Sequence, residues 1–246
     1  MKALVVGGAS GMGRAIAQRL AERGDSVFLA GIGEEDLARS AQDLTARHPK
    51  GAVAKYGILD MEKPETFAAA LDAADAALDK FDSVIVTAAL FGSQDALEAD
   101  IEFCRRLVTV NYANTVVLCE HVRKRLLERG GGHLTVFSSV AGDRGRKPVA
   151  IYGSSKAGLS VYLEALDHKF HEKGLAVLCV KPGFVKTGMT AGLKPPPFAG
   201  EPEQVADDVI RAMDARKPMI YTPGMWALVM LVIRWLPRFV MRKIGF

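Results

Sequence analysis

This sequence has little cysteine, no long apolar run and no acidic residue near its C-terminus. The three cysteines among 246 residues form no CxxC pair, so we expect free thiols and neither a disulfide framework nor a redox centre. The five histidines share no metal-ligand spacing, so no metal site is predicted. The longest apolar run, residues 225–233, is far shorter than the roughly 20 residues that a membrane-spanning helix needs.

The composition indicates an ordinary globular protein. Hydrophobic residues make up 49% of the chain and charged residues 24%, and one domain spanning residues 1–246 is expected at this length. The formal net charge of +4 is small and dispersed, so we expect no nucleic-acid partner. No signal peptide precedes the first apolar run at residue 2, which predicts a cytoplasmic protein.

Apolar runs typical of buried strands alternate with helical patterns along the chain. Continuously apolar strands with helical crossovers predict an α/β, Rossmann-like, doubly wound sheet of seven parallel strands. Ligands of such sheets bind at the carboxyl ends of the strands. The predicted strands are residues 2–6, 26–31, 52–58, 82–88, 133–139, 175–181 and 219–222. The predicted helices are residues 12–23, 34–46, 64–79, 95–109, 112–129, 151–172 and 202–215.

A dense glycine cluster joins the first predicted strand to the first predicted helix. Gly7, Gly11 and Gly13 are spaced G-x-x-x-G-x-G, where side chains are excluded from the turn. The free N–H groups and partial positive charge of the helix N-terminus suit a pyrophosphate. A tight turn without a ligand needs the same residues, so the motif alone leaves both interpretations open.

Asp60 directly follows the third predicted strand. A carboxylate at this point is suited to accept a hydrogen bond from an adenine amino group, with the backbone of Met61 alongside. A helix N-cap ahead of Pro64 also favours an aspartate here, so both roles remain open.

The pair Tyr152 and Lys156 gives the strongest chemical signal. Residues four apart share a helix face, and a tyrosine ordinarily ionises near pH 10. We expect the lysine cation to lower the pKa of the tyrosine and to make it a general acid for a carbonyl oxygen. Ser138 and Ser139 end the fifth predicted strand, where a hydroxyl can bind the same carbonyl oxygen. An exposed helix face is the alternative for a YxxxK pair taken by itself.

Together these features resemble the short-chain dehydrogenase/reductase family over nearly the whole chain. In the family's tetrad, Asn111 matches the asparagine that holds a water linked to the lysine, and Ser139 matches the substrate-binding serine. Tyr152 matches the acid/base, and Lys156 the lysine that holds the nicotinamide ribose. The resemblance implies NAD(H) or NADP(H) as cofactor and a homodimer or homotetramer. The implied cofactor-binding residues are Gly7, Ser10, Gly11, Met12, Gly13, Asp60, Met61, Ala88, Tyr152, Lys156, Pro182, Gly183 and Thr187.

The sequence departs from the family pattern at two places. After the fourth predicted strand the family has Asn-Asn-Ala-Gly, whereas this chain has Val-Thr-Ala-Ala at residues 86–89, so we expect Thr87 to replace part of a lost hydrogen bond. After the second predicted strand neither the aspartate of NAD enzymes nor the arginine of NADP enzymes is present. Glu34 and Glu35 follow instead and are expected to repel a 2′-phosphate, which favours NAD.

Three stretches resemble a narrower group, the reductases of the lipid-linked sugar decaprenylphosphoryl-2-keto-erythro-pentose. They are residues 138–159, 181–189 and 221–244. The resemblance implies a ketone substrate that is a keto-sugar on a polyprenyl phosphate. Residues 187–200 correspond to the family's mobile substrate lid.

The C-terminal tail, residues 225–246, is both apolar and basic. No acidic residue follows Asp214, while Arg234, Arg238 and Arg242 recur every four residues. This pattern suits contact with an anionic lipid surface, peripherally at the inner membrane, or with a lipid substrate. Packing on its own domain or on a second subunit explains it equally, and Pro237 is expected to separate two short helices.

The sequence therefore predicts an NAD(P)-dependent oxidoreductase that reduces a ketone to an alcohol or catalyses the reverse reaction. Two alternatives remain: a catalytically silent cofactor-binding scaffold, and a membrane-peripheral adaptor of the same fold.

Overall fold

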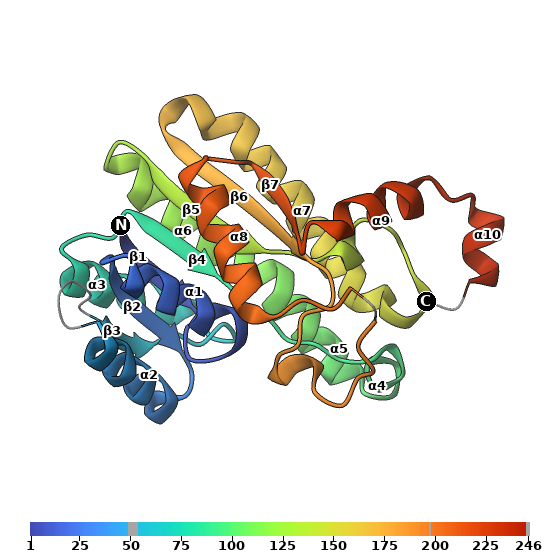
Figure 1. Cartoon of the computed structure of the whole chain (residues 1–246), viewed down its shortest axis with the longest axis horizontal. Coiled ribbons are helices and arrows are strands. Elements are labelled where there is room, and N and C mark those ends of the chain that lie inside the picture. The colour runs from blue at the N-terminus through green and yellow to red at the C-terminus, as the bar shows by residue number, and fades with distance from the viewer. Residues whose placement is uncertain (49–53, 197, 245–246) are drawn as a thin grey trace.

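The chain folds around one sheet of seven parallel strands (Figure 1). The structure is a computed structural model and describes residues 1–48, 54–196 and 198–244. The strand order is β3-β2-β1-β4-β5-β6-β7, which confirms the predicted Rossmann-like, doubly wound α/β fold. Residues 52 and 53 of the third predicted strand lie outside the described residues. The strands are β1 (Lys2–Val6), β2 (Ser26–Gly31), β3 (Ala54–Ile58), β4 (Ser83–Val86), β5 (Gly132–Phe137), β6 (Leu175–Pro182) and β7 (Met219–Thr222).

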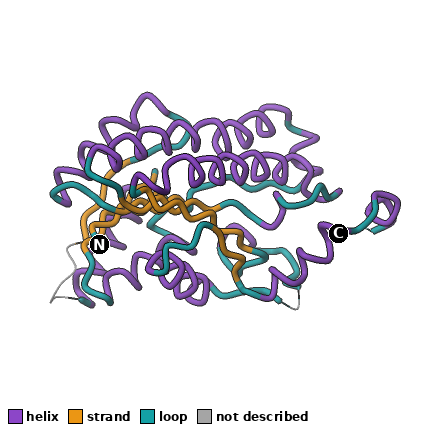
Figure 2. Tube along the Cα trace, turned by 90° about the horizontal axis from the view of Figure 1, so that it is seen from above, coloured by secondary structure: helices purple, strands orange, loops and turns teal. Residues whose placement is uncertain are grey.

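Helices cover both faces of the sheet, which is therefore the buried middle layer (Figure 2). Successive side chains of a strand point to opposite faces. In β1, Ala3 and Val5 pack in the core on one side, whereas Leu4 and Val6 pack in the core on the other. This is why the central strands are apolar over most of their length, whereas the edge strand β3 has exposed positions. One layer contains α1 (Gly11–Glu22), α2 (Glu34–Arg47) and α8 (Pro202–Asp214), and the other contains α3 (Phe67–Leu78), α6 (Thr115–Glu128) and α7 (Ala150–Phe170).

Two of the predicted helices differ from the structure. The segment predicted as 95–109 is divided into α4 (Gln94–Ala99) and α5 (Ile101–Val108), because Asp100 has an extended backbone and caps α5. Its Oδ1 accepts hydrogen bonds from the N–H groups of Glu102 and Phe103, both at 3.0 Å. The helix predicted from residue 112 starts as a π-helical turn, η2 (Thr109–Asn114).

Short helical turns complete the connections between these elements. Thr187 and Thr190 cap the turn η6 reciprocally, which orders the start of the segment predicted as a lid. These turns are η1 (Pro64–Thr66), η3 (Val140–Gly142), η4 (Lys147–Val149), η5 (His171–Lys173) and η6 (Gly188–Thr190).

The C-terminal tail forms two short helices that extend from one end of the molecule (Figure 1). These are α9 (Met225–Trp235) and α10 (Arg238–Lys243), and Pro237 separates them as predicted. Met230 and Ile233 are buried against Val140, so α9 packs on the loop after β5. Within the described parts of the chain, no helix is long and apolar enough to cross a membrane.

Candidate active site

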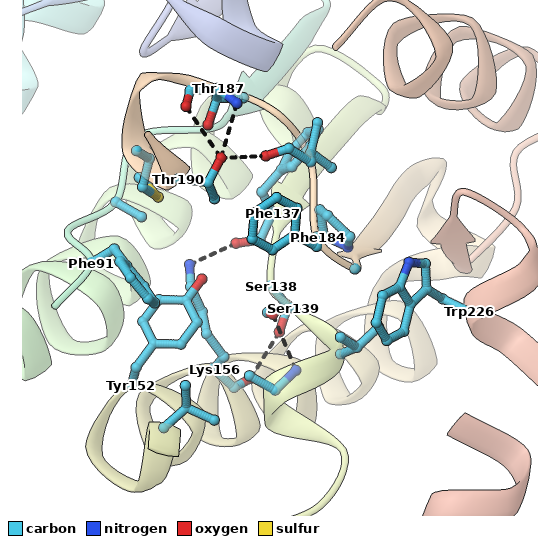
Figure 3. Close-up of a pocket in the computed structure, with 18 of the residues that line it drawn as sticks. Phe91, Phe137, Ser138, Ser139, Tyr152, Lys156, Phe184, Thr187, Thr190 and Trp226 are labelled. Atoms are coloured by element: carbon cyan, nitrogen blue, oxygen red, sulfur yellow. Dashed lines mark hydrogen bonds between the residues drawn. The ribbon is translucent and has the colours of Figure 1, made fainter. Parts of the chain in front are cut away.

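A cavity of about 710 Å³ lies at the carboxyl ends of the strands, where ligands of such sheets bind. Its wall combines the end of β5, the start of α7, the segment after β6 and the inner face of α9 (Figure 3). Of the residues predicted for the site, seven line this cavity. They are Met12, Ser139, Tyr152, Lys156, Pro182, Gly183 and Thr187.

Tyr152 and Lys156 lie on the first turns of α7 and face the cavity together. The Nζ of Lys156 lies 5.8 Å from the centre of the Tyr152 ring and donates a hydrogen bond to the carbonyl oxygen of Phe137 at 2.9 Å. On its other side the tyrosine ring meets the edge of Phe91, with ring centres 5.2 Å apart. The phenol is therefore held between a cation and an aromatic ring, with its hydroxyl in the cavity (Figure 3).

The expected lowering of the tyrosine pKa is wrong for this structure. Burial raises the pKa of Tyr152 to about 12, and the Ser139 hydroxyl offsets this only in part. Burial also lowers the pKa of Lys156 to about 8, because this residue is only 2% exposed. Loss of solvation is the largest cause of both shifts, so the phenol keeps its proton at neutral pH.

The two serines at the end of β5 have different partners. Ser138 is buried, and its hydroxyl donates to the carbonyl oxygen of Lys156 at 2.9 Å and shares a 2.7 Å hydrogen bond with Ser160. Ser139 caps η3 by accepting a hydrogen bond from the N–H of Ala141 at 3.1 Å. This bond does not use the hydroxyl proton of Ser139, which faces Tyr152 and can turn to a ligand in the cavity, while Ser138 fixes α7 to the sheet.

Asn111 lies outside the cavity lining and is fully buried in η2. Its Oδ1 accepts from the N–H of Leu90 at 2.7 Å, and its Nδ2 donates to the carbonyl oxygen of Leu90 at 2.8 Å. These two bonds leave a second N–H and the backbone carbonyl of Asn111 outside the pair, so its contact with a water stays a prediction. The side chain therefore braces the segment after β4, which carries Ala89 and Phe91 into the cavity wall.

The glycine turn packs tightly on the residue that replaces the family's asparagine. The Thr87 hydroxyl donates to the carbonyl oxygen of Val6 at 3.0 Å. A Cβ at Gly13 would lie 2.2 Å from the carbonyl oxygen of Gly7, and a Cβ at Gly7 would lie 2.5 Å from the Thr87 hydroxyl. Gly7 also has a positive φ of 88°. The turn leaves no room for side chains, and Thr87 supplies a hydrogen bond to it as predicted.

Of the other predicted residues at this edge, Ser10 precedes α1 with its side chain exposed and makes no capping bond. Ala88 donates its N–H to the carbonyl oxygen of Val6 at 3.2 Å. The Oδ1 of Asp60 accepts from the N–H of Glu62 at 2.9 Å, while Met61 is buried in the core. Asp60 thus orders the turn ahead of Pro64, and its contact with an adenine stays a prediction.

The segment after β6 joins the glycine turn to the C-terminal tail. A Cβ at Gly11 would lie 3.4 Å from the Cγ2 of Thr187, so this threonine lies next to the glycine turn. A Cβ at Gly183 would lie 2.0 Å from the Nε1 of Trp226. The indole donates from Nε1 to the carbonyl oxygen of Phe198 at 3.2 Å. The sequence indicated only that Trp226 belongs to an apolar tail. No motif or residue spacing in the sequence predicts the contact between this tryptophan and Gly183.

Comparison with known proteins agrees with this geometry. The family model for the short chain dehydrogenases matches residues 1–197, which is most of the chain. The chain belongs to the short-chain dehydrogenase/reductase family. An uncharacterized oxidoreductase of Mycobacterium tuberculosis is 33% identical to it, over 98% of this chain and 95% of its own. A 3-oxoacyl-[acyl-carrier-protein] reductase of Chlamydia muridarum is 29% identical over 78% of this chain and 76% of its own.

A solved structure extends the likeness to a cofactor complex. The crystal structure of a variant of actinorhodin polyketide ketoreductase with NADPH superposes on this chain with a TM-score of 0.80, and the two sequences are 25% identical. The match covers 89% of this chain and 94% of that one. As a member of this family, the chain is an NAD(P)-dependent oxidoreductase that acts on CH–OH and C=O groups.

Proposed function

We propose that this oxidoreductase reduces a ketone carried on a largely apolar molecule, or catalyses the reverse oxidation, with Tyr152 as the proton donor. The observation that carries the proposal is that Ser139, Tyr152 and Lys156 line one cavity with the segment after β6. The rest of the cavity wall is mostly aliphatic and aromatic, which favours an apolar substrate.

The residues around the glycine turn fit a nicotinamide cofactor. The turn is too tight for any Cβ at Gly7 or Gly13, which holds the start of α1 close to β1 and β4, and the N-terminus of this helix is suited to a pyrophosphate. Gly11 and Thr187 complete the same surface, and Pro182 and Gly183 form the cavity wall next to it. The bound cofactor supplies the hydride, and the protein supplies position and a proton.

The proton comes from Tyr152 in this proposal. A phenol with a pKa of about 12 is protonated at neutral pH and can donate to the more basic alkoxide that forms on the substrate. Ser139 donates a second hydrogen bond to the same oxygen. Lys156 stabilises the phenolate left behind, since its amine lies below the ring. Asn111 acts by holding the β4 segment in place.

A panel of ketones tests the proposal. The protein is incubated with each ketone and with NADH or NADPH, and the alcohol product is identified by mass spectrometry. Alcohol formed together with oxidised cofactor supports the proposal. Saturable cofactor binding without turnover on any ketone would instead favour the scaffold alternative.

For the cofactor we propose a preference for NADH. Glu34, Glu35 and Asp36 form the first turn of α2, at the carboxyl end of β2, and would repel a 2′-phosphate. The structural neighbour described above contains NADPH, so both cofactors belong in the titration. Tighter binding of NADPH would overturn the preference.

For the substrate we propose a 2-keto sugar on a polyprenyl phosphate as the first compound to test. The supporting features are the three sequence stretches given above and the apolar cavity beside α9. Reduction of such a lipid-linked ketone, with no reduction of the free keto-sugar, would support this choice. Equal activity on the free sugar would contradict it.

We propose that the outer face of the tail contacts an anionic membrane on the cytoplasmic side. Trp235 is 81% exposed and Phe239 66%, and Arg238 and Arg242 of α10 are exposed cations that anionic lipid would attract. The test is flotation with vesicles rich in phosphatidylglycerol, comparing the intact protein with Trp235→Ser and Phe239→Ser together. These substitutions leave the inner face of α9 intact. Equal flotation of both proteins would end this proposal.

We also propose that residues 187–200 act as a substrate lid. Met189, Thr190, Leu193 and Phe198 line the cavity from this segment, and Pro197 lies outside the described residues. Slower hydrogen exchange in this segment with cofactor and ketone than with cofactor alone would support a lid. Unchanged exchange would contradict it.

Finally, we propose a homodimer or homotetramer. Several apolar side chains are exposed where α5, η2, α6 and α7 adjoin, and a second copy would cover them. Light scattering of the protein and of Val161→Lys tests this, and a monomer at every concentration would contradict it. These exposed residues are Ile101, Val108, Tyr112, Val117 and Val161.

A further inference from the structure

Arg146 brings a cation into the apolar cavity and makes no salt bridge with the described residues, although Asp143 attracts it from a distance. It lies between η3 and η4, and its side chain lines the same cavity as Tyr152. Its Nε is buried and has no hydrogen-bond partner among the described residues. Burial holds the pKa of Arg146 below its usual value. An unpaired polar group in such a place is costly for the folded protein, so a partner is expected from outside the chain.

The neighbouring charged residues are all engaged elsewhere. Arg144 donates to the carbonyl oxygen of Leu236 at 2.7 Å, and Lys147 donates to that of Arg242. Asp143, the acid nearest in sequence, accepts from Lys181 at 2.7 Å on one oxygen and from Tyr221 at 2.5 Å on the other. These contacts anchor the loop against β6, β7 and the tail, and Arg146 alone of its basic residues lines the cavity.

The charge of the cavity wall has one sign. Among the described residues that line it, Arg146 and Lys156 are the charged side chains, and no aspartate or glutamate is present. Lys156 donates to Phe137 beside the tyrosine, whereas the Nε of Arg146 has no acceptor in the described part of the chain. A guanidinium is well suited to bind a carboxylate or phosphate through two parallel hydrogen bonds.

We propose that Arg146 binds an anionic group, a carboxylate or a phosphate, on the substrate and so determines specificity. The substrate class is then an amphiphilic ketone, with an apolar body against the cavity wall and an anion at the guanidinium. This inference rests on the proposed function only in taking the cavity as the substrate site. A phosphate of the cofactor is the other possible source of the anion.

A binding experiment tests the site without relying on turnover. Two fluorescent dyes of similar shape serve as probes, anilinonaphthalene sulfonate, which is an anion, and N-phenylnaphthylamine, which is neutral. In Arg146→Met the affinity for the anionic dye should fall about tenfold or more, the size expected for losing a charge-assisted hydrogen bond. The affinity for the neutral dye should stay the same, and Arg146→Lys should recover part of the loss. Arg144→Met is the matched control and should bind both dyes as the unaltered protein does.

A kinetic experiment extends the test to substrates. Methyl ketones that end in a carboxylate, in chains of increasing length, are compared with their methyl esters. Arg146→Met should raise KM for the keto acids and leave their kcat nearly unchanged. Both kinetic constants for the methyl esters should change little. If Arg146→Met loses affinity for the anionic dye alone but no ketone is turned over, the anion site is supported and the proposed function is contradicted.

Two results would overturn the assignment. The first is equal loss of affinity for both dyes, which would mean that Arg146 only shapes the cavity. The second is a weaker affinity of Arg146→Met for NADH or NADPH, measured by nicotinamide fluorescence, which would assign the guanidinium to the cofactor.

Discussion

The indole of Trp226 lies directly against the backbone of Gly183, so that a methyl group on this glycine would be 2.0 Å from Nε1. Gly183 follows β6 in the segment predicted to bind the cofactor, and Trp226 belongs to α9 in the tail. The contact makes the inner face of the tail part of the cavity wall, together with Val229 and Ile233. The tail therefore serves the cavity on one face and exposes apolar and basic residues on the other.

Gly183→Ala should displace this indole. The new methyl group overlaps the ring, and moving the ring breaks the hydrogen bond to Phe198. We expect a loss of about 1–3 kcal/mol in the free energy of unfolding and a changed tryptophan emission. Urea unfolding and fluorescence measure both. Gly188→Ala is the control, because nothing lies within 4 Å of its Cβ. An unchanged emission spectrum in Gly183→Ala would contradict the contact.

Gly13→Ala should abolish cofactor binding. Its Cβ would lie 2.2 Å from the carbonyl oxygen of Gly7, and backbone atoms cannot move aside as a flexible side chain can. The turn must open, which removes the surface for the pyrophosphate. Titration with NADH and NADPH measures the effect. Gly145→Ala, with open space around its Cβ, should bind as the unaltered protein does. Normal affinity in Gly13→Ala would show that the turn is not the cofactor site.

Lys156 should make the stability of the cofactor-free protein depend on pH. Its pKa is about 8 in the folded state against 10.5 as the ordinary value, so the unfolded chain binds more protons between these pH values. The free energy of unfolding should therefore rise as pH increases from about 8 to 10.5, by on the order of 1–3 kcal/mol from this group. The free energy of unfolding of the unaltered protein and of Lys156→Met is measured by urea unfolding across this pH range. The difference between the two values gives the contribution of the lysine. A difference that is constant or falls with pH would contradict the lowered pKa.

Asp143→Ala should destabilise the protein strongly. The carboxylate is 4% exposed and pairs with Lys181, which is 14% exposed, while Tyr221 donates to its other oxygen. Removing it leaves a largely buried cation and a half-buried hydroxyl without their acceptor, at a cost of about 2–4 kcal/mol in the free energy of unfolding. Glu102→Gln provides the comparison, because its pair with Arg105 is well exposed and should contribute less than about 1 kcal/mol. Similar losses in both variants would contradict the burial of this pair.

The sequence predicted the sheet well for a definite physical reason. A parallel strand covered on both faces must be apolar at each position, and that pattern is visible without knowing its neighbours. The division at Asp100 was missed because it depends on a single cap, which the apolar pattern around it does not indicate. The role of Thr87 was predicted because it stands in the stretch where the family has a hydrogen-bonding asparagine, and its hydroxyl does donate to the carbonyl oxygen of Val6.

Properties that depend on the tertiary environment were not visible in the sequence. The spacing of Tyr152 and Lys156 placed them on one helix face, but their burial reversed the expected pKa change. Asn111 was recognised by its motif, whereas its pairing with Leu90 appears only once the segment after β4 is in place. The position of Arg146 was not visible either. Arg144 and Lys147 are basic residues of the same loop, and only the structure shows that Arg146 lines the cavity while the other two do not.

The most direct test of the account is Tyr152→Phe, measured for turnover and for cofactor binding in the same preparation. Energy transfer from Trp226 to reduced nicotinamide reports binding, in a Trp235→Phe background where Trp226 is the sole tryptophan. We predict a cofactor affinity that is unchanged within about twofold, and a turnover that falls at least about a hundredfold, because only the proton donor is lost. Full turnover in Tyr152→Phe would show that the proton comes from another group and would refute the mechanism.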